Sequence, residues 1–546
     1  MLPAMLFDAR AADRSRFARR FDVCVAGTGP AGMTVARTLA ARGFDVALME
    51  AGGLEVTADS QEAYVGENVG LDYYDLDTAR LRCFGGSSEH WNGRCRGYDA
   101  YDFPATRARP LGWPIGKADL DPYEPVVSEI LDLDPTEPEP APEADPVVAA
   151  SGGRLRTVKW RHSPPTRFAA KYLAEVTASP RIAACVNAAL VDLVLDAGLT
   201  AVEGAVFRSD RPGDPGFTVA ADAYCLCLGG LENPRLLLSA DRQIPQGIGN
   251  RHDLVGRYFC EHPAVRSARV LLKRKPAREK YPFAATPELL EREGLLDFHM
   301  MLEARATAPQ PFRRALASGL QCLDPFTERL AREALGRWPS CRVGGIDEFF
   351  GRLDPDGQNW GWVMFDLEQE LSLDSRVTLG EERDALGLRR LRLDWRLTER
   401  DYRTMQRGIT LLGQYLAAAD IGRLRVADWL LEADPVIPPV DRDLGNGSCH
   451  HMCTTRMSDD PRTGVVDRNC RVHGVANLYL GGSSVFATPG FVNPTYTVVQ
   501  LALRLADHLS EPRTAAAHRE LGQGLDQGLD QGFDQGLGQA ADPRQN

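Results

Sequence analysis

The pattern of apolar and polar residues predicts a compact series of elements near the start of the chain. Residues 21–26 form a short apolar run typical of a buried strand, and the glycine-rich segment 27–32 follows it directly. Apolar residues then recur at helical spacing over residues 31–39. A second apolar run, 44–49, ends at Glu50. The pattern therefore predicts strand, glycine turn, helix and strand, closed by an acidic residue.

The glycine turn has the Gly-x-Gly-x-x-Gly spacing of dinucleotide-binding folds. Gly27 permits the tight turn, Gly29 lets the backbone approach a pyrophosphate, and Gly32 lets the helix pack closely on the strand. The helix N-terminus then faces the phosphates, and Glu50 can accept hydrogen bonds from ribose hydroxyls. An acidic residue here disfavours a 2′-phosphate, so FAD or NAD is expected rather than NADP.

A second glycine turn follows in residues 82–93. Its two glycines and two serines offer backbone N–H groups suited to a phosphate or to the edge of a flavin ring. A purely structural glycine turn with one structural histidine remains an alternative. The cofactor-binding residues expected in this segment are Gly85, Gly86, Ser87, Ser88, His90 and Asn92.

In the middle of the chain, the alternation of predicted strands and helices resumes after an interruption. Residues 134–146 are rich in proline and acidic residues and are interpreted as an exposed linker. A helix is predicted over 167–176 and strands over 181–196. Residues 224–238 again predict a strand, a glycine turn and a helix, with Pro234 near the first turn of that helix. The dinucleotide-binding domain is therefore expected to be discontinuous.

The pattern in residues 263–440 predicts a sheet of a different kind. Strand-like runs occur at 266–272, 361–365, 376–379 and 391–395, and a helical pattern covers 399–419. Strands followed by a helix indicate an antiparallel sheet with covering helices, facing a substrate. The predicted fold class is α/β (α+β overall).

Composition narrows the functional classes. The chain has 546 residues, 44% of them hydrophobic, and a formal net charge of -12, which disfavours a nucleic-acid surface. Its 12 cysteines form no small-domain disulfide framework, which favours a reducing compartment and a cytoplasmic location. No run is long enough to span a membrane, and no signal peptide is predicted.

The segment from Cys449 to Thr497 carries the candidate chemistry. His450 and Asn493 are polar groups capable of catalysis, and they bracket a predicted strand and glycine turn. Asn493 also suits the N-cap of a helix, with Pro494 at the first helical position. The cluster of Cys and His at 449–453 has ligand types that suit zinc or copper. Consecutive residues cannot all converge on one ion, however, so no metal is expected.

These motifs together resemble the glucose–methanol–choline (GMC) oxidoreductase family over residues 21–509. The matching motifs are the glycine turn with Glu50, the second glycine turn, the segment Gly229–Leu238 and a closing block. That block contains His450, Thr454, Arg456, Met457, Val465-Val466-Asp467 and Asn493-Pro494-Thr495. The family has a glycine where this chain has Cys453, which places an added side chain near the catalytic loop.

The resemblance implies bound FAD and oxidation of an alcohol. We expect His450 to be the base that takes the hydroxyl proton, with Asn493 holding the same hydroxyl. Gly482, Asn493, Pro494 and Thr495 join the predicted cofactor-binding residues. His90 matches the position that carries covalent FAD in pyranose oxidase, and whether FAD is covalent here is left open.

Resemblance to the pyranose oxidase branch favours a sugar, glycoside or polyol as substrate. His451, Glu368 and His262 are expected to reach that substrate. The resemblance assigns 18–104, 180–262 and 441–510 to the FAD-binding domain, and 105–179 and 263–440 to the substrate-binding domain. Residues 511–546, which contain Gly-Leu-Asp-Gln repeats, are expected to form a disordered tail.

Two other functions remain open at this point. One is hydroxynitrile-lyase-type cleavage on the same scaffold, without net redox change, and the other is a non-catalytic flavoprotein. The sequence leaves open whether oxygen, a quinone or a protein accepts the electrons. It also leaves open the exact substrate and the oligomeric state.

Overall fold

The fold was taken from a computed structural model of the chain. It describes residues 6–11, 13–136, 138–139, 141–273, 280–304, 360–439 and 448–511. Apart from Glu511, the predicted tail 511–546 lies outside the described residues, as do 441–447.

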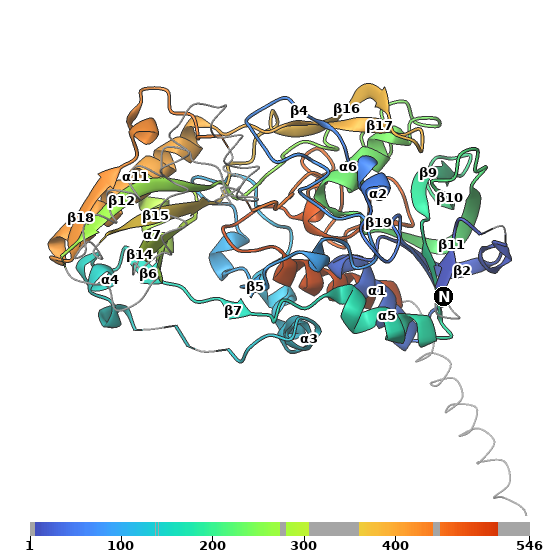
Figure 1. The fold of residues 1–546 in the computed structure, drawn as a ribbon, viewed down its shortest axis with the longest axis horizontal. Helices are drawn as coiled ribbons and strands as arrows, with labels where there is room; N and C mark the ends of the chain where they lie inside the picture. Colours follow the sequence, from blue (N-terminus) through green and yellow to red (C-terminus); the bar gives the residue numbers. More distant parts are fainter. Residues whose placement is uncertain are drawn as a thin grey trace, which may run out of the picture.

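A parallel sheet occupies one half of the molecule (Figure 1). Among the described residues its strands run in the order β1-β8-β3-β2-β11, with β19 also paired to β11, and all of these pairs are parallel. The strands are β1 (Leu6–Asp8), β8 (Ile182–Val186), β3 (Val46–Met49), β2 (Arg20–Ala26), β11 (Phe217–Leu226) and β19 (Leu478–Leu480). Because β2 lies in the middle, its carboxyl end faces the crevice where doubly wound sheets bind ligands.

Helices and an antiparallel extension accompany these strands. The helices α1 (Pro30–Ala41) and α5 (Phe168–Ala178) contact the parallel strands, and α6 (Gly229–Ser239) follows β11. The strands β9 (Ala189–Leu195) and β10 (Val202–Arg208) extend the sheet antiparallel from β11. The predicted strand–turn–helix units at 21–39 and 224–238 are both present, so the α/β fold class is confirmed.

An antiparallel sheet forms the other half, with the order β18-β12-β15-β14-β13-β6 in the described residues (Figure 1). Its strands are β18 (Gly422–Val426), β12 (Ala264–Leu272), β15 (Trp360–Leu367), β14 (Phe298–Ala304), β13 (Lys280–Ala285) and β6 (Leu155–Thr157). Helix α11 (Glu399–Ala418) covers one face, and a Cβ added at Gly408 would lie 2.7 Å from the ring of Phe365. Thr398 caps this helix by accepting a hydrogen bond from the Asp401 backbone.

The remaining elements are short. They are α2 (Ala58–Glu62), α3 (Glu124–Ile130), α4 (Pro146–Ala150), α7 (Pro287–Glu293), β5 (Arg94–Cys95) and β7 (Arg161–His162), together with single 3₁₀ turns. The described part of the predicted linker 134–146 is irregular apart from a 3₁₀ turn at Pro142–Ala144, and its last residue begins α4.

Two predicted strands belong to a different sheet from the one expected. The runs at 376–379 and 391–395 lie in β16 (Arg376–Arg383) and β17 (Arg389–Asp394), and β17 pairs with β4 (Glu67–Asn68). Their assignment to the substrate-facing sheet was therefore wrong. Alternation of apolar residues predicts a strand but says nothing about which strand lies beside it.

Pro234 also lies deeper in its helix than predicted. Since α6 begins at Gly229, Pro234 is inside the helix and not in its first turn. Proline has no N–H to bond the carbonyl four residues earlier, which here belongs to Gly230. The Thr454 hydroxyl donates to that carbonyl at 2.5 Å, so the closing block replaces the missing helical hydrogen bond.

Two separate groups of buried apolar side chains lie beneath the two sheets. The exact domain boundaries stay a prediction. Within the described ranges, no helix is both long enough and apolar enough to cross a membrane.

Candidate active site

The glycine turn between β2 and α1 leaves open space at the start of the helix. Gly27 has φ +97°, and a Cβ there would lie 2.4 Å from the Cys227 carbonyl oxygen. A Cβ at Gly32 would lie 1.9 Å from the Gly27 carbonyl oxygen, so both positions require glycine for packing. Among the described residues outside the turn itself, the nearest atom to a Cβ at Gly29 would be the Gly85 carbonyl oxygen, at 4.0 Å. This opening at a helix N-terminus suits the close approach of a phosphate.

Glu50 lies beside this turn at the carboxyl end of β3, as predicted, and its carboxylate is buried. One oxygen accepts from the Thr28 backbone N–H at 3.0 Å and from the Thr28 hydroxyl at 2.6 Å. The other accepts from the Gly52 N–H at 2.9 Å. Burial raises the pKa of Glu50, against the effect of these donors. The Gly52-bonded oxygen retains a lone pair for a ribose hydroxyl.

The two predicted glycine segments meet. The Gly85 N–H donates to the Thr28 hydroxyl at 3.0 Å, and a Cβ at Gly86 would lie 3.1 Å from Gly29 Cα. The Ser88 hydroxyl donates to the Gly85 carbonyl at 2.8 Å, so it shapes the turn. In this segment Ser87, His90 and Asn92 are exposed, although Ser87 also accepts a hydrogen bond from Leu81.

The closing block lies between two other segments. Met452 pairs antiparallel with Cys260, and the Cys453 N–H donates to the Ser483 carbonyl at 3.1 Å. Cys453 has φ +67°, a left-handed conformation that explains why a glycine would be favoured here. Its side chain is fully buried, as is that of Cys260, which pairs with Met452. The added side chain is therefore packed in the interior.

His450 is joined to a second histidine. Its Nδ1 lies 2.9 Å from Nδ1 of His262, and Nε2 of His262 lies 3.2 Å from the Pro489 carbonyl oxygen. A carbonyl can only accept, so His262 carries its proton on Nε2 when neutral. Its Nδ1 then accepts from Nδ1–H of His450. This hydrogen-bond chain leaves the lone pair of His450 on Nε2.

The surroundings keep His450 neutral. Loss of solvent, followed by the proximity of His262 and His451, holds the pKa of His450 well below its ordinary value. Burial likewise lowers the pKa of His262. No hydrogen bond joins Nε2 of His450 to any described residue, so this nitrogen is available to a ligand.

Glu261 fixes the backbones of both histidines. Its buried carboxylate accepts from the His262 N–H at 2.8 Å and from the His450 N–H at 2.9 and 3.0 Å, and the Tyr73 hydroxyl also donates to it. Burial raises the pKa of Glu261 to about 7. The only sequence signal for this role was the acidic residue immediately before His262.

Asn493 precedes the last described helix but does not cap it. The helix covers 495–511, and its first bonded carbonyl belongs to Pro494, which accepts from Val498 N–H at 2.9 Å. The cap predicted at Asn493 was wrong by one residue, within the usual uncertainty of helix boundaries. No hydrogen bond joins the Asn493 side chain to another described residue, so its amide is free for a ligand. Thr495 begins the helix.

The other predicted substrate residues are held by the protein itself. His451 packs against Tyr73 and Phe259, with ring centroids 5.9 and 6.2 Å away, and burial lowers its pKa to about 3. Glu368 is buried, accepts from Arg109 at 2.6 Å and also accepts from the Asp297 N–H at 3.0 Å. Glu368 is therefore held by hydrogen bonds within the protein, whereas Nε2 of His451 is buried with no hydrogen-bond partner among the described residues. Contact of either residue with a substrate stays a prediction.

Asn233 is a structural link that the sequence reasoning missed. Its amide donates to the Gly481 carbonyl at 3.0 Å and to the Ser484 hydroxyl at 2.8 Å. These bonds hold the turn containing Gly482, which has φ +99° and open space beside its Cα. The available signal was the Asn-Pro pair inside a helical pattern.

Comparison with known proteins gives consistent results. Residues 372–502 match the family model described as GMC oxidoreductase. Paromamine 6′-oxidase of Streptomyces fradiae is 24% identical, with 89% of this chain and 91% of that protein aligned. 6‴-Hydroxyparomomycin C oxidase of Streptomyces lividus is 24% identical, with 91% and 93% aligned. The structure of pyridoxine 4-oxidase from Mesorbium loti shares the fold, with a TM-score of 0.55 at 18% identity, over 90% of this chain and 99% of that one.

Proposed function

The chain belongs to the GMC oxidoreductase family, and we propose that it oxidises a hydroxyl group of a sugar, glycoside or polyol to a carbonyl with FAD. Oxidation of an alcohol, CH–OH to carbonyl, is the reaction supported by its relatives. The observation that carries the residue assignment is the His450–His262 pair, which leaves a lone pair on Nε2 of His450.

The residues around the glycine turns fit FAD. The open space at Gly29, the N-terminus of α1 and the contact between Gly29 and Gly86 form a cradle for the pyrophosphate. Glu50 would hold the ribose, and Gly482 with residues 493–495 would line the flavin. When bound, FAD supplies the acceptor for the hydride.

In the proposed reaction, Nε2 of His450 accepts the proton of the substrate hydroxyl. The free amide of Asn493 holds the same hydroxyl, so that the oxygen is placed for proton transfer. As His450 becomes positively charged, its Nδ1–H donates more strongly to the neutral His262. The Pro489 carbonyl accepts a hydrogen bond from the other side of His262, so the two rings need not move when the proton is transferred.

The substrate class is supported by the relatives that align along most of the chain. Their names, paromamine 6′-oxidase and 6‴-hydroxyparomomycin C oxidase, denote oxidation of paromamine and of a hydroxyparomomycin. A hydroxyl of a sugar or glycoside is the corresponding proposal for this chain.

One anaerobic experiment tests the proposal. The purified yellow protein is mixed with a panel of sugars, glycosides and polyols, and flavin absorbance is followed. Bleaching by a panel member supports the proposal, whereas turnover of a cyanohydrin without bleaching would favour a lyase. Air is then admitted, and peroxide formation separates an oxidase from a dehydrogenase.

Covalent attachment through His90 is tested on the same sample. Acid precipitation leaves a yellow pellet if FAD is covalently bound and a yellow supernatant if it is not. A His90→Ala variant that releases FAD into the supernatant would assign the link to that residue.

A further inference from the structure

Arg94, in β5, is a half-buried cation that no carboxylate contacts directly. Its Cζ lies 3.7 Å from the centroid of the Trp160 ring, and its Nη2 is buried without a hydrogen-bond partner among the described residues. In the described ranges no acidic side chain lies within ion-pair distance of Arg94. Proteins rarely leave a buried donor unpaired, because its lost hydrogen bonds to water are then not replaced. Arg94 therefore retains a donor for a ligand.

Asp366, in β15, is the carboxylate that acts most strongly on Arg94. Burial lowers the pKa of Arg94, and Asp366 followed by Glu303 opposes that effect. One oxygen of Asp366 accepts from Nδ1–H of His299 at 2.9 Å, and no described residue donates to the other. The Asp366 side chain is 18% exposed, which leaves room for a ligand beside it.

Both groups are charged at neutral pH, and they lie apart. Against the effect of burial, His299 and then Arg94 lower the pKa of Asp366. Attraction between the guanidinium and the carboxylate would favour direct contact, yet the two remain beyond ion-pair distance. Such a gap between a cation and an anion suits a ligand group that can form a hydrogen bond with each of them.

A hydroxyl group fits this gap better than an ionised group. It can donate its hydrogen to the carboxylate and accept a hydrogen bond from the guanidinium. A ligand carboxylate would be repelled by Asp366, and a ligand ammonium by Arg94. Hydrogen bonds in which one partner is ionised are stronger than neutral ones. The pair therefore favours a neutral ligand that carries hydroxyl groups.

The register of the antiparallel sheet places Asp366 near the histidine pair. Asp366 lies between Ala264 of β12 and His299 of β14, and His262 precedes Ala264 by two residues. Neighbouring strands are about 4.8 Å apart and two residues advance about 6.8 Å, so the backbones of Asp366 and His262 lie about 8 Å apart. One sugar ring with its hydroxyl groups can bridge the side chains at these two positions.

Electrostatic interactions also link Arg94 and Asp366 to the histidine pair. After burial and the neighbouring histidines, the charge of Arg94 lowers the pKa of His450. Burial lowers the pKa of His262, and the Pro489 carbonyl and then Asp366 oppose this effect. The cation and the carboxylate therefore lie within electrostatic range of the histidines proposed to act on the reacting hydroxyl.

The segment that ends at Asn493 contacts both groups of residues. The Pro489 carbonyl oxygen lies 3.2 Å from Nε2 of His262. Two residues further on, the Phe491 ring stacks on the ring of His299, with centroids 6.0 Å apart. One short segment therefore joins the histidine pair, the amide proposed to hold the reacting hydroxyl and the support of the carboxylate.

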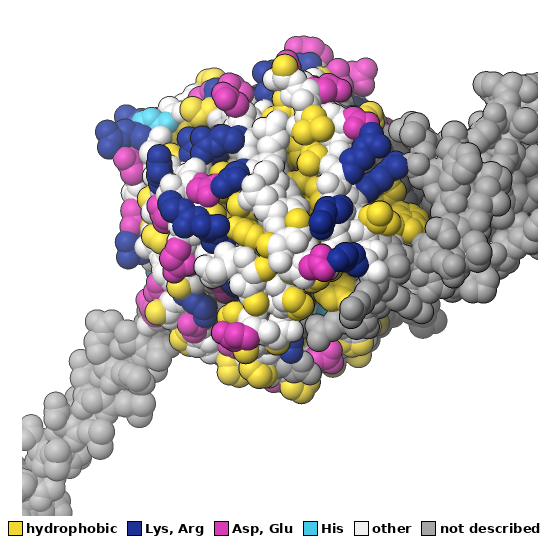
Figure 2. Space-filling model, turned by 90° about the vertical axis from the view of Figure 1, so that its left-hand side faces the viewer, with side chains coloured by type: hydrophobic (Ala, Val, Ile, Leu, Met, Phe, Trp, Pro, Cys, Tyr) yellow, Lys and Arg dark blue, Asp and Glu magenta, His cyan; other side chains and the backbone are white. Residues whose placement is uncertain are grey.

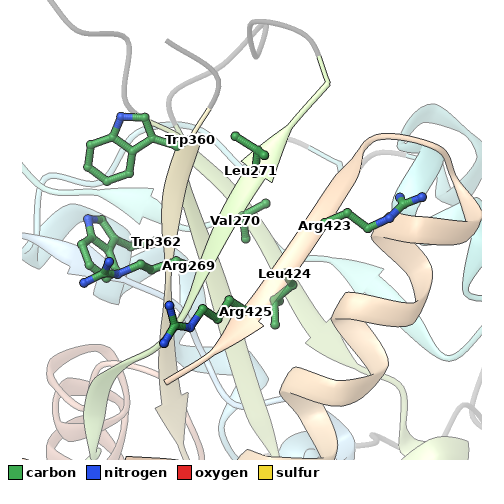
Figure 3. Close-up of a pocket in the computed structure, with 8 residues that line it drawn as sticks. All are labelled: Arg269, Val270, Leu271, Trp360, Trp362, Arg423, Leu424 and Arg425. Atoms are coloured by element: carbon green, nitrogen blue, oxygen red, sulfur yellow. The ribbon is translucent and has the colours of Figure 1, made fainter. Parts of the chain in front are cut away.

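A separate pocket lies at the opposite end of the same strands (Figure 3). It has a volume of about 360 Å³, and its lining contains Arg423 but neither Arg94 nor Asp366. Lys and Arg side chains lie among hydrophobic ones on the surface at that end of the molecule (Figure 2). Arg423 donates to the Gly422 carbonyl at 2.9 Å. It therefore supplies an arginine of the same sheet that lies outside the gap.

We propose that Arg94 and Asp366 bind a second hydroxyl group of the substrate while His450 takes the proton of the first. The inference deepens the proposed function and rests on it, because both hydroxyl groups belong to one molecule. The preferred substrate is then a neutral sugar or cyclic polyol. A simple alcohol has no group for this position and binds weakly.

The test is isothermal titration calorimetry with methyl β-D-glucopyranoside and its monodeoxy analogues, each of which lacks one hydroxyl group. The protein carries FAD and the change His450→Gln, so that turnover is slow during the titration. Loss of one particular hydroxyl should weaken binding about 10–100-fold, the range for hydrogen bonds to charged groups. When Asp366→Asn or Arg94→Gln is added, the glucoside itself should bind correspondingly weakly. Loss of the same hydroxyl should then have little further effect.

Arg423→Gln is the matched control, and it should leave the binding of every probe unchanged. Arg94→Lys keeps the positive charge and a donor, so it should bind the glucoside more tightly than Arg94→Gln does. FAD content and circular dichroism identify variants that fail to fold.

An equal loss on removal of every hydroxyl, or the same losses with and without the two added changes, would overturn the proposal. Absence of glucoside binding would overturn it as well. Calorimetry needs no flavin reduction, so these results would leave the proposed function standing. Failure of every sugar in the anaerobic panel to bleach the flavin would instead contradict the proposed function itself.

Discussion

Replacing His262 tests how the histidine pair activates His450. His262→Phe keeps a ring of similar shape but removes the acceptor for Nδ1–H of His450. When His450 takes the substrate proton, this bond joins a charged donor to a neutral acceptor. Hydrogen bonds of that kind contribute about 1.5–3 kcal/mol, which corresponds to about 10–150-fold in rate. We expect flavin reduction to slow by about 100-fold.

The measurement is anaerobic stopped-flow reduction of the bound flavin by a substrate found in the panel. His262→Asn is the matched control, because its Oδ1 can take the place of Nδ1 and accept from His450. It should retain a rate within about tenfold of the parent, the loss expected for weaker neutral hydrogen bonds. FAD content and circular dichroism identify variants that fail to fold.

The pH dependence gives a second readout in the same experiment. Since the pKa of His450 lies well below its ordinary 6.5, the base stays neutral at pH 7. The rate of reduction should hold from pH 8 down to pH 6.5 and fall only at lower pH. Folding stability should also decrease below pH 6.5, where the unfolded chain binds a proton that the folded His450 excludes. A phenylalanine variant with the parent's rate and profile would refute the reasoning.

Three further changes test the cofactor cradle and its supports. At Gly29 the φ angle is −63°, which alanine also adopts, and there is open space for a methyl group. The stability of Gly29→Ala without FAD should therefore equal that of the parent, while its FAD content falls. Full FAD occupancy would count against the cradle. Thr454→Val removes the hydroxyl that donates to the Gly230 carbonyl and should cost about 1–3 kcal/mol in chemical denaturation. Thr410→Val, at an exposed helical hydroxyl, should cost less, and equal losses would remove the special role of Thr454. Glu261→Gln replaces one acceptor oxygen with a donor that faces backbone N–H groups. The free energy of unfolding and the rate of flavin reduction should therefore both fall. If neither changes, Glu261 does not position the two histidines.

Local sequence patterns predicted the elements that depend on neighbouring residues. The glycine spacing predicted the turn between β2 and α1, because the left-handed φ of Gly27 and the close contact of Gly32 with the Gly27 carbonyl both arise within a few residues. Apolar alternation gave the strand positions but placed β16 and β17 in the wrong sheet. Strand pairing depends on distant segments, and no single-strand pattern encodes it.

The chemistry of the site could be predicted only in part for the same reason. His450 was identified from its motif, whereas its contact with His262 joins residues 188 positions apart. The acceptor on the far side of His262 is a backbone carbonyl, which every residue carries and which no side-chain pattern reveals. Cys453 was recognised as a departure from the family, and the structure shows that its side chain is fully buried.

The most direct test of the central claim compares His450→Gln with the parent protein in anaerobic stopped flow. Both proteins should carry the same amount of FAD, because the proposed cradle does not include the His450 ring. Loss of a positioned base should slow flavin reduction by about 10²–10⁴-fold. Reduction of the His450→Gln flavin at the parent's rate would contradict the assignment of His450 as the base.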